Sequence, residues 1–162
     1  ERVTLSEILN VNPGMGGTTI QADLTDAKQI PSNTYDCAIL TFTLQFIFDV
    51  PAALRTLGRI LRPGGVLLVI VPGISQIARY DMDNWGEFWR FTSLSARRLF
   101  EQVFRPEDIT ITTYGNVLSS LASLHGLHST ELTTAELDHW DRDYELVIGI
   151  RAVKRPAANT SL

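Results

Sequence analysis

One stretch of this chain brings together side chains that can contact a small ligand. Five aromatic residues lie between residues 80 and 92, and three of them, with one guanidinium, are the candidates: Tyr80, Trp85, Trp89 and Arg90. Aromatic faces stack on sugar rings, and a guanidinium pairs with an acid or a phosphate. The competing interpretation is structural, with Trp89 packed against the following helix and Arg90 covering it. The residue types therefore indicate either a binding surface or a packed segment.

Three polar residues follow predicted strands, where side chains of an α/β sheet often meet ligands. They are Asn12, Asp23 and Asn116. A carboxylate accepts two hydrogen bonds at once, whereas an amide accepts only through its one oxygen. Each also has a structural interpretation, because Asn12 begins an Asn-Pro-Gly turn sequence and the other two can cap helical turns.

The histidines do not form a metal-binding pattern. His125 and His128 stand three residues apart, His139 lies beside acidic residues, and no Cys/His spacing matches a zinc site. The glycine cluster at residues 14–17 precedes a predicted strand instead of joining a strand to a helix, so it lacks the context of a dinucleotide-binding loop. No G-x-S-x-G nucleophile motif occurs. We therefore predict no metal site.

Strands and helices are expected to alternate along the chain. The predicted strands are Leu5–Val11, Thr18–Ala22, Tyr35–Phe42, Val66–Val71, Ile109–Tyr114 and Tyr144–Val153. Three helices are predicted to begin after the caps Asp49, Thr92 and Asn116. The first should end at Pro63, before a glycine turn, and the third carries Val117, Leu121 and Leu124. This alternation predicts a doubly wound α/β fold, with residues 1–155 as a single domain and 156–162 as a disordered tail.

Two of these predicted strands are apolar without alternation, at residues 37–40 and 66–71. Continuous apolar strands are typical of parallel sheets that helices cover on both faces. We therefore expect both faces of these strands to be buried.

Composition excludes several classes of partner. The formal net charge is −4, which argues against binding to nucleic acid through phosphates. No basic run or long apolar run appears, so we expect no membrane association. The single cysteine, Cys37, cannot form an internal disulfide, and we expect a cytoplasmic protein.

The residues from Ala22 to Gly73 resemble the middle of a class I S-adenosylmethionine-dependent methyltransferase. The strongest likeness is RILRPGGVLLVIVPG, Arg59 to Gly73, which corresponds to that family's helix stop, Pro-Gly-Gly turn and buried strand. The resemblance implies a Rossmann-like, mostly parallel sheet with an antiparallel C-terminal strand. It also implies S-adenosylmethionine as cofactor and methyl transfer to a small-molecule or glycan acceptor.

The resemblance implies roles for individual residues. The implied cofactor-binding residues are Asn12 at the ribose, Asp23 and Leu24 at the adenine, and Thr41, Phe42 and Gln45 at the methionine side and the transferred methyl. Gln45 and Tyr80 are the catalytic candidates, because either side chain could orient the acceptor. Phe42 has the alternative interpretation of a core residue.

The sequence WGEFWRFT, Trp85 to Thr92, resembles a segment of methyltransferases from sugar and cell-surface glycan pathways. This likeness is the basis for a sugar or glycan acceptor. It implies five acceptor-binding residues: Tyr80, Trp85, Trp89, Arg90 and Asn116.

The first strand of that family and its glycine-rich loop have no counterpart in this sequence. Three arrangements are open: the chain is a fragment, its second and fourth strands pair directly, or residues 1–11 occupy the central position. An unpaired strand edge would favour association with a second copy or with an upstream segment. The alternative to an enzyme is an inactive methyltransferase-like domain that serves as a scaffold or binds a partner.

Overall fold

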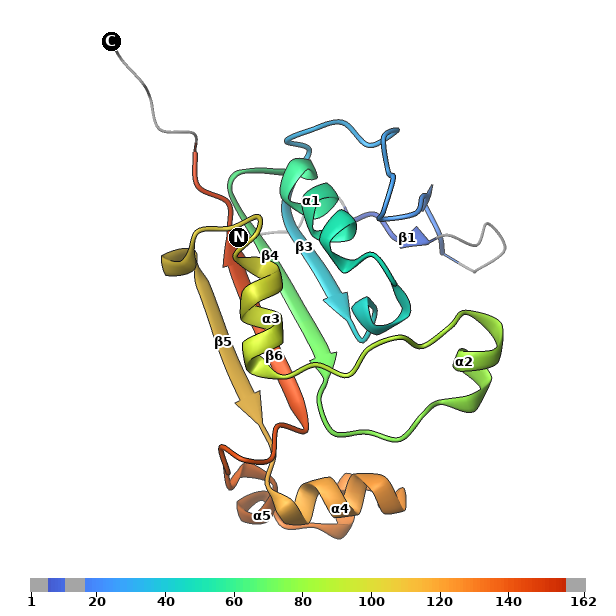
Figure 1. Ribbon diagram of the computed structural model, residues 1–162, viewed down its shortest axis with the longest axis vertical. Coiled ribbons are helices and arrows are strands. Elements are labelled where there is room, and N and C mark those ends of the chain that lie inside the picture. The colour runs from blue at the N-terminus through green and yellow to red at the C-terminus, as the bar shows by residue number, and fades with distance from the viewer. Residues whose placement is uncertain (1–5, 11–16, 157–162) are drawn as a thin grey trace.

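The computed structural model describes residues 6–10 and 17–156, and four of the described strands form the main sheet (Figure 1). These strands, in spatial order, are β3 (Tyr35–Thr41), β4 (Leu61–Pro72), β6 (Val147–Val153) and β5 (Ile109–Tyr114). Strands β3 and β4 run parallel, and β6 runs antiparallel to both of its neighbours. The predicted α/β sheet with an antiparallel C-terminal strand is confirmed.

A second, small parallel sheet pairs β1 (Leu9–Asn10) with β2 (Ile20–Gln21). Among the described strands, neither of these pairs with β3, whose outer edge has no strand partner. Within the described residues, the second and fourth strands therefore do not pair directly, and the β1 segment does not occupy a place beside β3. A side-chain bond links the segment before β1 to the main sheet, because the Tyr35 hydroxyl donates to the Glu7 carboxylate over 2.5 Å.

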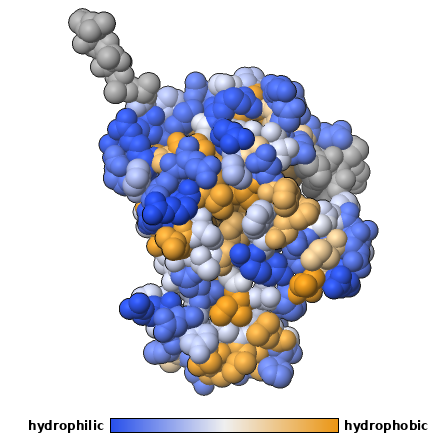
Figure 2. Space-filling view, viewed as in Figure 1, coloured by the Kyte–Doolittle hydropathy of each residue, from blue (hydrophilic) through white to orange (hydrophobic). Residues whose placement is uncertain are grey.

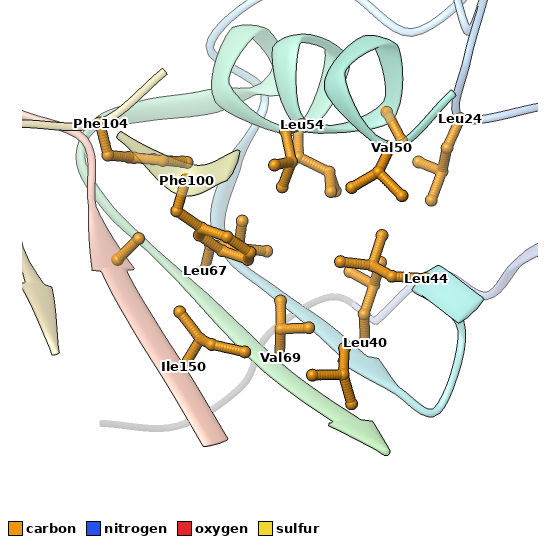
Figure 3. Packing of buried hydrophobic residues seen from close by; sticks show 14 of the residues in the cluster. Leu24, Leu40, Leu44, Val50, Leu54, Leu67, Val69, Phe100, Phe104 and Ile150 are labelled. Carbon is orange, nitrogen blue, oxygen red and sulfur yellow. The ribbon is translucent and has the colours of Figure 1, made fainter. Parts of the chain in front are cut away.

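Two helices, α1 (Val50–Ile60) and α3 (Ser93–Phe100), cover one face of the main sheet (Figure 1). The Asp49 side chain accepts from the Ala52 amide at 3.0 Å and caps α1 as predicted. Thr92 and Ser95 form the capping box of α3. Figure 3 shows the core between these helices and the sheet, where side chains of both layers interdigitate, among them Leu54, Leu67, Val69, Phe100 and Ile150.

The other face of the main sheet is not covered by described helices, so the prediction of burial on both faces is wrong. Side chains alternate between the two faces of a strand. Leu67 and Val69 are therefore buried under the helices, whereas Ile39 is 68% exposed and Leu68 is 38% exposed on the opposite face. A run of apolar residues does not by itself reveal whether a second layer is present.

Helix α1 ends three residues earlier than predicted, at Ile60, because Leu61 already pairs with Tyr35 in the sheet. Gly64 has a φ of +86°, as expected for the glycine turn. The remaining helical elements are η1 (Leu44–Phe46), α2 (Arg79–Asn84), η2 (Pro106–Asp108), α4 (Val117–His125), η3 (Ser129–Glu131) and α5 (Thr134–Asp138). Within the described ranges, no helix combines the length and apolar character needed to cross a bilayer.

Candidate functional site

The loop that follows β3 contains a buried polar atom without a partner. Gln45 lies in the short helix η1 and is only 4% exposed. Its side-chain oxygen Oε1 is buried and has no hydrogen-bond partner among the described residues. An unpaired buried acceptor costs about 1–3 kcal/mol. This position, at the carboxyl end of a parallel strand, is where ligands bind in α/β sheets, and it identifies the loop as the candidate site.

The backbone of the same loop is strained at Phe42. Its φ is +46°, in the left-handed region that side chains with a Cβ rarely adopt. The Phe42 amide donates to the Ile70 carbonyl at 2.9 Å, which holds the loop against the end of β4. Thr41, the last residue of β3, is exposed beside it. Strained residues occur preferentially at ligand-binding sites, and Phe42 is itself at the surface, with 45% of the residue exposed.

The aromatic segment predicted to bind an acceptor lies directly against this loop. The Phe88 amide donates to the Gln45 carbonyl at 2.8 Å, and the Trp89 indole Nε1 donates to the Ile47 carbonyl at 3.0 Å. Phe48, which sequence reasoning missed, stacks on Trp89 with ring centroids 5.9 Å apart and meets Phe88 edge-on at 5.4 Å. The Phe-rich sequence of the loop was the only available signal for Phe48, since its contacts join residues about forty positions apart.

A mostly apolar cavity of about 370 Å³ opens next to this aromatic cluster. Its lining residues are Phe48, Asp49, Val50, Pro51, Trp89 and Leu99. The cavity therefore joins the start of α1 to the acceptor segment.

The Arg90 guanidinium is bonded to other groups of this chain. Its guanidinium donates to the carbonyls of Ser75 and Gln76 and pairs with Glu87 at 3.1 Å. The Glu87 side chain is 6% exposed and also accepts from the Ala78 amide at 3.0 Å. This network fastens the loop after β4 to the aromatic segment.

The predicted adenine-side residues, Asp23 and Leu24, lie in the turn that follows β2. The Asp23 carboxylate is exposed and its Oδ1 accepts from both the amide and the hydroxyl of Thr25 at 2.8 Å. The Leu24 side chain points into the core beside Val50 and Leu44 (Figure 3). The turn at Asp23 is thereby packed onto the element that carries Gln45. Asn12 lies outside the described residues.

The other predicted acceptor-binding residues lie apart from Gln45. Tyr80 is 73% exposed on α2, which projects away from the sheet, and Trp85 ends the same helix (Figure 1). Asn116 is buried at the start of α4, where its Nδ2 donates to the carbonyls of Glu136 and His139 and its Oδ1 accepts from the Ser119 amide. Its polar side-chain atoms therefore join α4 to α5.

The perturbed ionisable groups lie away from the candidate site. Burial and the bond to Glu7 raise the pKa of Tyr35 to about 12, but Tyr35 stands at the opposite end of β3. Burial lowers the pKa of Lys154, whose ammonium donates to the Leu61 carbonyl at 2.7 Å. Across the part of the chain that is described, no three His, Cys, Asp or Glu side chains are grouped to hold a metal ion.

Comparison with known proteins identifies the family. A family model described as a methyltransferase domain matches residues 3–110. The ubiquinone/menaquinone biosynthesis C-methyltransferase of Escherichia coli O1:K1 is 29% identical over 140 residues, which cover 84% of this chain and 51% of that protein. The chain thus spans about half the length of the curated relatives it matches.

Solved structures share the fold at low sequence identity. A SAM-dependent methyltransferase from Archaeoglobus fulgidus aligns with a TM-score of 0.58 and 13% identity, covering 90% of this chain and 74% of that one. Phosphoethanolamine N-methyltransferase 2 of Haemonchus contortus, in complex with phosphomonomethylethanolamine and S-adenosylhomocysteine, aligns with a TM-score of 0.53 and 14% identity, covering 83% and 36% of the two chains.

Proposed function

The chain belongs to the methyltransferase-domain family whose model matches residues 3–110, and from this premise we propose that it is part of an enzyme that methylates a flat, apolar small molecule. S-adenosylmethionine is the cofactor of this family, and when bound it supplies an electrophilic methyl group. The observation that carries the proposal is the buried Gln45 Oε1 after the carboxyl end of β3, which no group of residues 6–10 or 17–156 satisfies.

The fit of the cofactor rests on the chain's own donor and acceptor groups. Gln45 offers a desolvated carbonyl oxygen that can accept from an ammonium or hydroxyl group. Asp23 offers an exposed carboxylate at the end of β2, and Thr41 offers an exposed hydroxyl. We assign Asp23 to the adenine side and the loop at residues 41–45 to the methionine side, while the role of Asn12 stays a prediction.

The cavity beside Trp89 favours an aromatic acceptor over a sugar. A sugar needs several polar partners, yet the Trp89 indole N–H is bonded to Ile47 and the Arg90 guanidinium is bonded to Ser75, Gln76 and Glu87. The faces of Phe48 and Trp89 and the apolar cavity wall match a planar ring instead. The curated relative named for ubiquinone and menaquinone biosynthesis points the same way, so we propose a hydroquinone-type ring carbon as the methyl acceptor.

In this proposal the protein acts by placement and exclusion of water. Phe42 and Phe48 cover the reacting region with apolar surface, and the Gln45 oxygen orients a donor group of the cofactor or the acceptor. Fixing two reactants in line lowers the barrier without any nucleophile from the protein. Tyr80 and Trp85 stay candidates for acceptor contacts made outside the cavity.

Calorimetric titration of the folded chain with S-adenosylhomocysteine tests the cofactor site. We expect binding with a Kd in the micromolar range, roughly −8 kcal/mol, that falls at least about tenfold in Asp23→Ala and in Gln45→Met. Asp26→Ala is the control for Asp23→Ala, and Gln102→Met is the control for Gln45→Met. Both side chains are exposed and neither belongs to the proposed site, so these changes should leave binding unchanged. No heat from folded protein would favour the alternative of an inactive methyltransferase-like domain.

Acceptor class is tested separately with labelled S-adenosylmethionine. A prenylated hydroquinone and a sugar nucleotide are offered in parallel, and we expect label only in the hydroquinone. Trp89→Ala should reduce this transfer without changing the affinity for S-adenosylhomocysteine. Label in the sugar nucleotide alone would overturn the assignment of an aromatic acceptor and leave the cofactor site standing.

A further inference from the structure

Helix α4 turns its large apolar side chains to the solvent, whereas α1 and α3 each bury an apolar face. Four of them, which we name the α4 stripe, are between 43% and 51% exposed: Val117, Leu118, Leu121 and Leu124. The opposite side of the helix buries Ser119, Ser120 and Ala122. At 100° per residue the four apolar positions fall on one side of the helix. Figure 2 shows the resulting apolar surface at the end of the molecule where Figure 1 places α4.

This arrangement leaves apolar surface exposed and polar groups buried. The Ser120 hydroxyl oxygen is buried without a hydrogen-bond partner among the described residues. A helix that packs small polar residues inward and leucines outward gains little from the hydrophobic effect on its own. Contiguous apolar patches on a protein surface mark sites of interaction.

The segment around the α4 stripe is strongly acidic. Residues 116–146 contain six carboxylates and one arginine, a net charge of −5, whereas the whole chain carries −4 and the remainder is therefore +1. Two of the carboxylates, those of Glu131 and Glu136, accept bonds from backbone amides at the starts of η3 and α5. The bonds from Thr133 lower the pKa of Glu136, so that side chain stays ionised near neutral pH.

A cavity of about 370 Å³ is lined by residues of the α4 stripe and by two residues that carry carboxylates, Glu136 and Asp141. Its other lining residues are Asn116, Val117, Leu118, Ala135 and His139. No cation pairs with Glu136 or Asp141 among the described residues. The surface thus combines an apolar ridge with an adjoining hollow that can receive a positively charged side chain.

We propose that the α4 stripe is the docking surface for a protein segment that presents apolar residues at helical spacing with a lysine or arginine beside them. The apolar residues pack along Leu121 and Leu124, and the basic side chain enters the cavity beside Glu136 and Asp141. The negative charge around the α4 stripe favours a basic protein segment over the other possible binding partners. An anionic lipid surface, or a second copy of this chain that docks through the same segment, would bring negative charge against the −5 segment.

Binding of synthetic peptides to the full 162-residue chain tests the proposal. The probe is a helical peptide of about 18 residues, long enough to form a helix, with leucine at every third or fourth position and lysine on the flanks. One control peptide replaces lysine with glutamate, and another replaces leucine with serine. We expect the Leu/Lys peptide to bind at least about tenfold more tightly than either control.

Variants of the chain locate the contact. Leu121→Gln should weaken binding of the Leu/Lys peptide about tenfold, as should the double change Glu136→Gln with Asp141→Asn. Leu121 is exposed, and glutamine at position 136 can still accept the capping bonds, so these variants should fold. Leu94→Gln on α3 is the matched control, since Leu94 is 65% exposed elsewhere, and it should leave binding unchanged.

Five outcomes would overturn the proposal. Four of them are equal binding of the Leu/Glu peptide, equal binding of the Ser/Lys peptide, unchanged binding by Leu121→Gln, and sedimentation with phosphatidylglycerol vesicles that depends on Leu121. A wild-type dimer in light scattering that Leu121→Gln dissociates would assign the α4 stripe to a second copy and would equally refute a basic partner.

Discussion

Replacing Gln45 with methionine should make the protein more stable and less able to bind ligand. The amide oxygen Oε1 is buried and has no partner in the described part of the chain, so the native state bears its desolvation cost. Methionine has nearly the same length and volume, and such a replacement leaves packing almost unchanged. Removing an unpaired buried carbonyl should therefore raise the free energy of unfolding by about 2 kcal/mol, within the 1–3 kcal/mol that such a group costs.

Thermal and urea unfolding measure this gain. For a chain of this length, about 2 kcal/mol corresponds to a rise in Tm of roughly 4–8 °C. Gln102→Met is the control, because Gln102 is exposed and its replacement should change stability by less than about 0.5 kcal/mol.

The result that refutes the reasoning is a lower Tm for Gln45→Met. It would mean that the amide oxygen is satisfied in the free protein and that the loop after β3 is an ordinary packed turn. Higher stability together with unchanged binding of S-adenosylhomocysteine would confirm that the buried oxygen destabilises the fold but would exclude Gln45 from the cofactor site.

Four further perturbations test the fold. Leu54→Ala should lower the free energy of unfolding by about 2–5 kcal/mol in urea, because this fully buried side chain would leave a cavity. Phe42→Val should be at least about 1 kcal/mol less stable than Phe42→Asn, since both lose the ring but only valine resists a positive φ; equal stabilities would contradict the strain. The pKa of Tyr35 is raised from 10.0 to about 12, so the folded state holds this proton more tightly than the unfolded state does. The protonated hydroxyl therefore stabilises the fold below pH 10, and this stabilisation is lost as pH rises toward 12. In Tyr35→Phe the free energy of unfolding should lose this dependence on alkaline pH. Asn116→Ala should cost about 2 kcal/mol and speed hydrogen exchange across α4 and α5, because it removes a helix cap and two bonds to α5 carbonyls; unaltered exchange there would argue against the joining role.

Local chemistry made much of the fold predictable. The predicted strands Tyr35–Phe42 and Ile109–Tyr114 match β3 and β5 within one residue. The caps at Asp49 and Thr92 begin helices as expected, because a cap depends on side chains within three residues of the helix start. Helix α2 and the short α5 were missed, since neither carries an apolar stripe that a periodicity search could find.

The candidate site was only partly predictable. Gln45 and Trp89 were both named from the sequence, and the structure brings their segments together through the Phe88–Gln45 and Trp89–Ile47 bonds. The bonds from Arg90 to the carbonyls of Ser75 and Gln76 could not be predicted, because every residue has a backbone carbonyl and the sequence does not show which one lies near a given side chain.

By itself, the sequence determined the helix starts after Asp49, Thr92 and Asn116, the left-handed turn at Gly64 and the acidic character of residues 116–146, because capping, backbone preference and charge depend on a residue and its near neighbours. Only the tertiary structure decided which apolar residues are covered. Leu67 and Ile39 lie in similar apolar runs, yet one is buried beneath α1 and α3 while the other faces away from them. Burial and the satisfaction of polar groups depend on which distant segments pack together, and the unpaired oxygen of Gln45 and the outward leucines of α4 follow from that packing alone.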